Sequence, residues 1–259
     1  MKLIFATFFT ALFVLGECKS QNLNDNLLYH NISYGIGSNQ IKEENLIPKV
    51  HQGLMHYISY GFEIRSNSYN HFQFNFGYGT LKTEIENEAL SINARLSFGY
   101  CHNFKILESA NLCYYLGPQS SFTSSLAEYE NWDEAHAYWG NYFSLGPSNV
   151  AFIKLDESKL LFLRLDLALL GLYTRPDYNR LYANEYWTFS NIMKIMNSHY
   201  HFGFWNNAFQ MNASTEYRTP IFKEYNLSLS ILIYYSQIQA EDGKPLKELI
   251  YKLGFGIWL

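Results

Sequence analysis

The sequence has little charge and, beyond its first residues, no long apolar segment. Charged residues make up 16% of the 259 positions, whereas ordinary soluble domains carry about 25%. No later run approaches the roughly 18 apolar residues that a membrane-spanning helix needs. Lysine and arginine form no basic block, which argues against a nucleic-acid partner. Aromatic residues are abundant instead: 22 Tyr, 20 Phe and 5 Trp account for 18% of the chain.

Residues 1–20 are predicted to be a secretory signal peptide. A lysine precedes an apolar run from Leu3 to Leu15, which is too short to cross a bilayer and has no stop-transfer pattern after it. Small residues at Cys18 and Ser20 favour cleavage after Ser20. The alternative is that Cys18 is lipidated, which Glu17 directly before it fits poorly.

Apolar residues alternate with small or polar residues along the mature chain, residues 21–259. This period of two predicts strands, and the runs approach the ten residues of a tilted membrane strand. One run has Leu90, Ile92, Ala94, Leu96, Phe98 and Tyr100 on one face, and Ser91, Asn93, Arg95, Ser97 and Gly99 on the other. Strands are predicted at 27–37, 53–65, 70–81, 89–102, 109–122, 135–147, 158–173, 199–217, 224–238 and 246–259.

Three features favour an all-β, transmembrane, up-and-down antiparallel barrel of about 10 strands (8–12) over a soluble sandwich. The polar faces carry mostly Gly, Ser and Asn, which suit a narrow lumen. Tyr and Phe gather at strand ends, as in interfacial girdles. The connections Ser38–Gln52, Ser124–Glu134 and Thr174–Ser198 are long and alternate with shorter ones. Short periplasmic turns and longer extracellular loops are the arrangement of such barrels.

On the signal peptide, the repeated amphipathic hairpins and the C-terminal strand, residues 21–259 resemble the bacterial outer-membrane β-barrel proteins as a class. The resemblance implies a bacterial outer-membrane location and contact with outer-membrane lipid and lipopolysaccharide. It also implies that a protein partner could bind the extracellular loops, and it calls for no cofactor. The strand number is similar to that of the omptin proteases.

The motifs of known barrel hydrolases are missing from the sequence. No histidine is followed by a serine two positions later, which is the spacing of outer-membrane lipid hydrolases. There is no Asp-x-Asp, and the adjacent Asp133 and Glu134 would face opposite sides of a strand. The sequence therefore predicts a protein without catalytic residues, although residues distant in sequence could still assemble a hydrolytic site.

Charged residues on the predicted lumen faces are the main candidate site. Glu63 and Arg65 lie two positions apart and therefore share a face, as do Arg164 and Asp166. Arg65 is also expected to lie near His71 across a short turn. This lumen polar network consists of Glu63, Arg65, His71, Arg95, Arg164, Asp166 and Lys252. It could select a small solute, or it could form a salt-bridged plug in a barrel too narrow to conduct.

Cys101 and Cys113 are predicted to form a disulfide. Both fall on lumen faces, symmetric about a turn near residues 105–107, and an exported protein meets an oxidising compartment. The alternative is a pair of buried thiols. Two cysteines alone are too few for a structural metal site, so no metal is predicted.

The predicted outer loops hold a second candidate, an acidic and aromatic loop that could bind a cation or another ligand: Glu128, Glu130, Trp132, Asp133 and Glu134. The alternative is a solvated loop. Residues 183–198 suggest a short amphipathic helix. Taken together, the sequence favours a closed, non-enzymatic barrel acting through its loops. A narrow pore for small solutes and a lipid- or peptide-hydrolysing barrel are the alternatives.

Overall fold

The computed structural model describes residues 27–43, 50–83, 88–104, 109, 111–129, 137–175, 200–222, 225–239 and 245–259. Within these ranges the regular elements are strands, and no helix there is long and apolar enough to cross a membrane. The strands are β1 Leu27–Glu43, β2 Val50–Arg65, β3 Ser68–Lys82, β4 Glu88–Asn103, β5 Leu112–Tyr129, β6 Ala137–Lys154, β7 Leu160–Ala168, β8 Leu170–Thr174, β9 His201–Phe204, β10 Ala208–Phe222, β11 Tyr225–Ile238 and β12 Leu246–Trp258.

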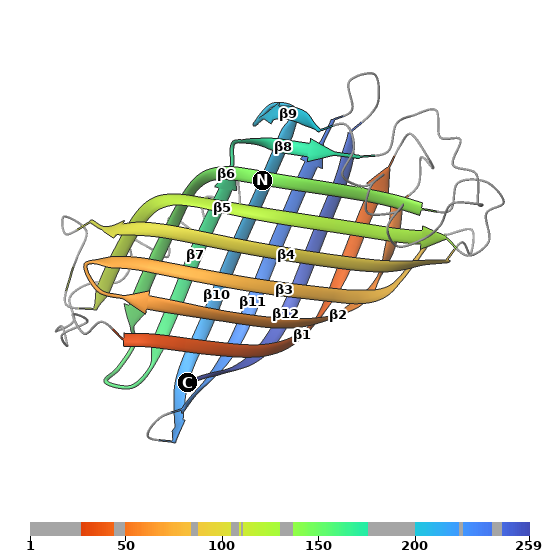
Figure 1. The fold of residues 1–259 in the computed structure, drawn as a ribbon. Helices are drawn as coiled ribbons and strands as arrows, with labels where there is room; N and C mark the ends of the chain where they lie inside the picture. The colour runs from red at the N-terminus through yellow and green to blue at the C-terminus, as the bar shows by residue number, and fades with distance from the viewer. Residues whose placement is uncertain are drawn as a thin grey trace.

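Ten of these strands close an antiparallel barrel, as the alternation predicts. Neighbours along the chain pair from β1 to β7, β7 pairs with β10, and β12 returns to β1. In Figure 1 the red-to-green strands β1–β6 cross in front of the blue strands β10–β12. Closure leaves no sheet edge between the first and last strands, where Asn31 pairs with Trp258.

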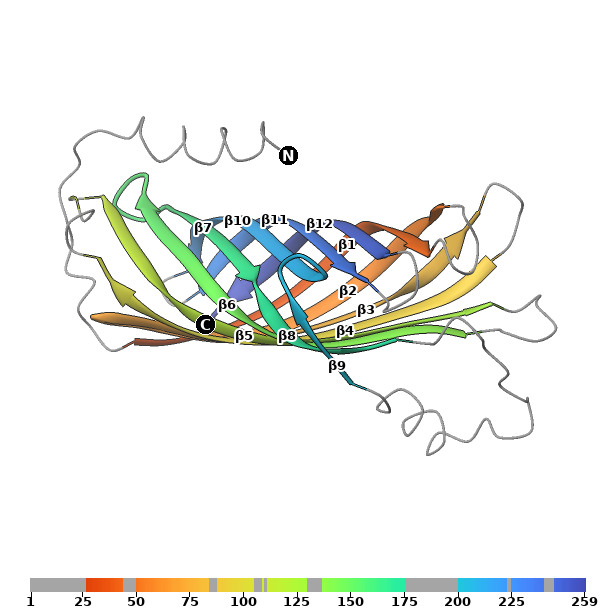
Figure 2. The ribbon, with the colours of Figure 1, turned by 90° about the horizontal axis from the view of Figure 1, so that it is seen from above.

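The short strands β8 and β9 lie outside this ring, near one rim (Figure 2). The prediction of one continuous strand over 158–173 is wrong, because the alternation slips at Leu169 and Leu170, which are both exposed. Such a slip is a β-bulge, and the unbroken leucine pattern gave no sign of it. The predicted strand 199–217 is likewise divided, by a turn at 205–207 in which Asn207 accepts a hydrogen bond from the Phe204 amide at 2.7 Å.

The barrel has an apolar exterior and a polar interior, opposite to a soluble protein. On β12, Leu253 and Phe255 are 62% and 61% exposed, whereas Lys252 between the outward positions is 6% exposed. On β2, Ile58 is 61% exposed and Ser59 1%. The large apolar side chains therefore point out of the ring and the small polar ones line the lumen.

The two ends of the barrel differ in their connections. The end that holds Leu27 and Leu259, here the terminal end, has the connections 66–67, 104–111, 155–159 and 223–224. The opposite end, here the loop end, has 44–49, 83–87, 130–136, 175–200 and 239–245. The longest connection lies at the loop end, as predicted. The predicted long connections Ser38–Gln52 and Ser124–Glu134 are wrong, because β1 continues to Glu43 and β5 to Tyr129, which leaves only 44–49 and 130–136.

The 155–159 connection is shaped by Asp156. One carboxylate oxygen accepts hydrogen bonds from the amides of Ser158 and Lys159 at 2.9 and 2.8 Å, and the other lies 2.8 Å from the Lys159 ammonium. These contacts lower the pKa of Asp156 below its ordinary 3.8. Because its folded pKa is depressed, its stabilisation is present above about pH 4 and is lost as the pH falls through the folded pKa. An NMR titration of Asp156 should show a midpoint below 3.8, and a midpoint at or above it would contradict this geometry.

Candidate functional site: the filled lumen

The structure places the whole predicted lumen network inside the barrel. Each side chain projects from the inward face of its strand and is at most 8% exposed: Glu63, Arg65, His71, Arg95, Arg164, Asp166 and Lys252. The structure brings four of these residues into two ion-paired groups and leaves His71, Arg95 and Lys252 outside both. Whether they form a functional site stays a prediction.

The first group is centred on Glu63 of β2. Its carboxylate pairs with Arg65 on the same strand and with Arg218, whose Nη1 lies 2.5 Å away on β10. The Tyr69 hydroxyl donates to the other carboxylate oxygen at 3.1 Å. Arg218 also pairs with Glu216 at 3.2 Å. Two guanidinium groups thus share two carboxylates, which balances the charge of the group.

The second group is centred on Asp166 of β7. Arg164 donates to it from Nε at 2.8 Å, and an Nη lies 2.7 Å from the other carboxylate oxygen, which makes a close ion pair. Ser148 and Asn212 donate to the same carboxylate at 2.6 and 3.1 Å from the neighbouring strands β6 and β10. The carboxylate therefore has partners from all three strands, which holds them in one register.

His71 lies beside the first group but outside its hydrogen bonds. The β2–β3 register places Glu63, rather than the expected Arg65, directly opposite His71. The imidazole stacks on Tyr69 at 5.4 Å, and a Cβ on Gly99 would meet it at 2.2 Å, so this position of β4 requires glycine. Among the described residues neither ring nitrogen of His71 has a hydrogen-bond partner.

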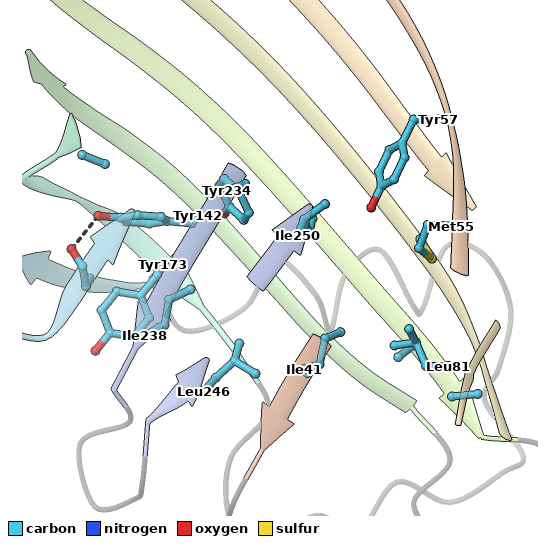
Figure 3. Close-up of a cluster of buried hydrophobic side chains, with 14 residues drawn as sticks. Ile41, Met55, Tyr57, Leu81, Tyr142, Tyr173, Tyr234, Ile238, Leu246 and Ile250 are labelled. Atoms are coloured by element: carbon cyan, nitrogen blue, oxygen red, sulfur yellow. Dashed lines mark hydrogen bonds between the residues drawn. The ribbon is translucent and has the colours of Figure 1, made fainter. Parts of the chain in front are cut away.

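An apolar layer fills the lumen toward the loop end. Figure 3 shows its larger side chains converging from several strands, with the Tyr142 hydroxyl donating to the Ala208 carbonyl at 2.9 Å. Tyr57 lies so close to Gly77 that a Cβ there would meet its ring at 2.4 Å. The layer consists of Ile41, Met55, Tyr57, Leu81, Ala89, Ala127, Tyr142, Ala168, Tyr173, Ala208, Tyr234, Ile238, Leu246 and Ile250.

An aromatic layer fills the lumen toward the terminal end. Phe152 is at its centre, with ring centroids of Phe162 and Tyr69 at 5.1 and 5.3 Å. The Arg65 guanidinium lies 4.3 Å from the Phe152 ring centroid, so this layer also contacts the Glu63 group. Its members are Tyr69, Cys101, Cys113, Tyr115, Val150, Phe152 and Phe162.

The predicted disulfide is wrong, because Cys101 and Cys113 are not joined in the structure. The β4–β5 register pairs His102 with Leu116, so the hairpin is centred near residue 109 and not near the predicted turn at residues 105–107. As a result Gly117, and not Cys113, lies opposite Cys101. Cys113 lies four positions further along β5, roughly 13 Å at the rise of a strand, which exceeds the reach of a disulfide. The Cys101 thiol instead lies 3.8 Å from the Ser148 carbonyl oxygen.

Three charged lumen residues escaped the sequence prediction. Arg218 was assigned to a turn, but β10 continues through it to Phe222. Glu216 and Arg218 could have been predicted from the alternation, because they continue the inward face of Asn212 and Ser214. Glu248 is 4% exposed and accepts from Asn39, Ser125 and Asn93 at 3.1, 3.3 and 3.5 Å.

The acidic loop lies mostly outside the described residues. Glu128 ends the described side chains of β5 and is exposed, whereas Glu130, Trp132, Asp133 and Glu134 are not described, nor are residues 1–20 and the expected helix at 183–198. No group of three or more His, Cys, Asp or Glu within the described ranges could hold a metal ion. The loop and the signal peptide stay predictions.

A closed antiparallel barrel with an apolar exterior and a polar, filled interior is the fold of the bacterial outer-membrane β-barrel proteins. Among solved structures, the chain is similar to the outer membrane protease OmpT from Escherichia coli, with a TM-score of 0.55, 8% identity and coverage of 95% of this chain and 99% of that one. No protein-family model and no curated protein matches the sequence.

Other similar structures differ in what they do. The translocator domain of the autotransporter NalP from Neisseria meningitidis has a TM-score of 0.43 and 10% identity, covering 97% of this chain and 92% of that one. Ail, the attachment invasion locus protein of Yersinia pestis, in complex with the heparin analogue sucrose octasulfate, has a TM-score of 0.32 and 8% identity, covering 90% and 99%. A likeness at 8% identity shows the fold alone and does not define an activity.

Proposed function

We propose that this protein is exported by a cleaved signal peptide and inserts as a β-barrel in a bacterial outer membrane. There it contacts lipid and lipopolysaccharide, and it acts without catalysis, as a structural or binding component, through the connections at its loop end. The apolar exterior supports insertion, because outward leucines and phenylalanines such as Leu253 and Phe255 would be unfavourable in water. Intact-mass measurement of the membrane-extracted protein should give a chain starting at Gln21, and retention of residues 1–20 would contradict the cleavage.

The single observation that carries the closed-lumen proposal is that buried apolar side chains from all ten strands of the ring meet in one layer across the lumen. The aromatic layer adds a second barrier toward the terminal end, where it contacts the Glu63 group. Two cavities lined by lumen residues measure only about 70 and 30 Å³. Since one water needs about 10–15 Å³, they hold a few waters rather than a stream of solute.

Planar-bilayer recordings test this proposal. The native barrel is expected to insert without steady single-channel conductance. A variant with alanine at Tyr57, Tyr142 and Tyr234 of the apolar layer and at Phe152 and Phe162 of the aromatic layer should conduct, because both layers then lose large rings. Heat-modifiable gel migration of both proteins verifies that each is folded. Steady native conductance that changes on Arg164→Ala would overturn the closed lumen and support the narrow pore.

Histidines on the exterior provide a second test of lipid exposure. The segments His30–Gly35 and His56–Gly61 nearly repeat each other, and the β1–β2 register lays them antiparallel. As a result Tyr34 hydrogen-bonds His56 at 2.6 Å, and His30 hydrogen-bonds Tyr60 at 3.0 Å. The tyrosine of each segment thus provides a hydrogen-bond partner for the histidine of the other, which would otherwise face acyl chains without one.

Tyr34→Phe is expected to destabilise the barrel by about 1 kcal/mol, because it leaves a His56 nitrogen without its partner. Urea unfolding in lipid vesicles measures the change. Tyr78→Phe is the matched control, since Tyr78 is also exposed on the exterior but has no hydrogen bond within the described part of the chain. Equal effects of the two substitutions would contradict the pairing.

A further inference from the structure

The lumen contains two buried cations that form no ion pair with a carboxylate in the described part of the chain. Arg95 is 8% exposed and Lys252 is 6% exposed, and within the described ranges neither lies within 4.0 Å of a carboxylate oxygen. The Arg95 Nε has no hydrogen-bond partner there. Lys252 donates only to neutral oxygens, Ser59 Oγ at 2.6 Å and Asn75 Oδ1 at 3.4 Å. A buried charge left without a counter-charge is strongly unfavourable.

Both cations line the same cavity. This cavity of about 30 Å³ lies between β2, β3, β4, β5, β10, β11 and β12 and has no aspartate or glutamate among its lining residues. Its other walls are neutral amides, a threonine and apolar groups, including Asn75, Asn93 and Asn212. The neighbouring cavity of about 70 Å³ also touches Lys252 but includes Glu63 and Glu216, which would repel an anion.

The remaining lumen carboxylate cannot supply the missing charge at close range. Glu248 does not line the cavity, and its oxygens accept from Asn39, Asn93 and Ser125. It lies four positions before Lys252 on β12, roughly 13 Å along the strand. Glu63, Glu216 and Asp166 are already paired with their own arginines.

We propose that the cavity between Arg95 and Lys252 is a binding site for one small inorganic anion of the halide class. The volume is larger than the roughly 10–15 Å³ that one water needs, so a monatomic halide fits within it. The guanidinium Nε and the third ammonium proton supply two charged donors. The bound anion would neutralise part of the positive charge of Arg95 and Lys252. This role does not depend on what the loops bind.

Bromide is the probe that tests this site. Crystals of the detergent-extracted protein soaked in sodium bromide should show an anomalous difference peak in the cavity between Arg95 and Lys252. In solution, the thermal unfolding midpoint should be higher in sodium bromide than in sodium gluconate at equal ionic strength, because gluconate is too large to enter. Lys252→Met should abolish this difference, and it should leave the midpoint in gluconate unchanged or raised.

Lys82→Met is the matched control, because Lys82 lies on the exposed end of β3 and pairs with Glu88. It should keep the bromide effect. The proposal is overturned if the native crystals show no bromide peak in the cavity, or if Lys252→Met responds to bromide as the native protein does. If Lys252→Met does not fold, the bromide soak of native crystals alone tests the anion site. Its result does not depend on whether the barrel conducts, so the two proposals can fail separately.

Discussion

Replacement of Glu63 by glutamine is expected to destabilise the barrel by about 3 to 5 kcal/mol, because it removes the shared counter-charge of Arg65 and Arg218 deep in the lumen. Glu63 is 1% exposed, so water cannot take over the lost interaction. Glu216 would remain as a partner of Arg218 alone. Arg65 would then have no carboxylate partner among the described residues. Urea unfolding in lipid vesicles, followed by tryptophan fluorescence, measures the loss.

Glu88→Gln is the matched control for Glu63→Gln. Its ion pair with Lys82 lies at the loop end of the β3–β4 hairpin, where both side chains are about half exposed. Exposed pairs contribute about 0 to 1 kcal/mol, so the control should be close to neutral. A Glu63→Gln effect as small as that of Glu88→Gln would show that the lumen network is hydrated rather than sealed.

Phe152→Ala is expected to cost about 3 to 5 kcal/mol, the usual range for removing a buried aromatic ring. Phe152 is 2% exposed and packs against Tyr69, Tyr115 and Phe162. Its loss would leave a cavity at the centre of the aromatic layer and would remove the ring over which Arg65 lies. The same unfolding measurement applies.

Phe255→Ala serves as the control for Phe152→Ala. Phe255 is 61% exposed on the outer face of β12. In a membrane, acyl chains can occupy the space that its ring leaves, so no empty cavity forms and the cost should be smaller. If the two substitutions cost the same, the aromatic layer is not a packed plug. Bilayer recordings on folded Phe152→Ala would then show whether the apolar layer seals the lumen by itself.

The register around the ring could not be predicted from the sequence. Glu63 and Arg218 are 155 positions apart, and they meet because β10 faces β2 across the closed barrel. The Cys101–Cys113 prediction failed for a related reason, since moving the centre of a hairpin by two residues moves every cross-strand partner by four. Alternation is unaffected by such a shift, because its period is two.

The amino-acid sequence by itself determined that the chain folds as strands with one apolar and one small, polar face, and it placed Arg95, Arg164 and Lys252 on the inward side. That much follows from a local property, the opposite direction of successive side chains along a strand. Only the tertiary structure decided which inward charges meet, that the slip at Leu169 leaves β8 and β9 outside the ring, and that Arg95 and Lys252 share a cavity without a carboxylate. These outcomes depend on how the strands are staggered when the sheet closes, and that stagger is set by packing across the lumen between residues far apart in the chain.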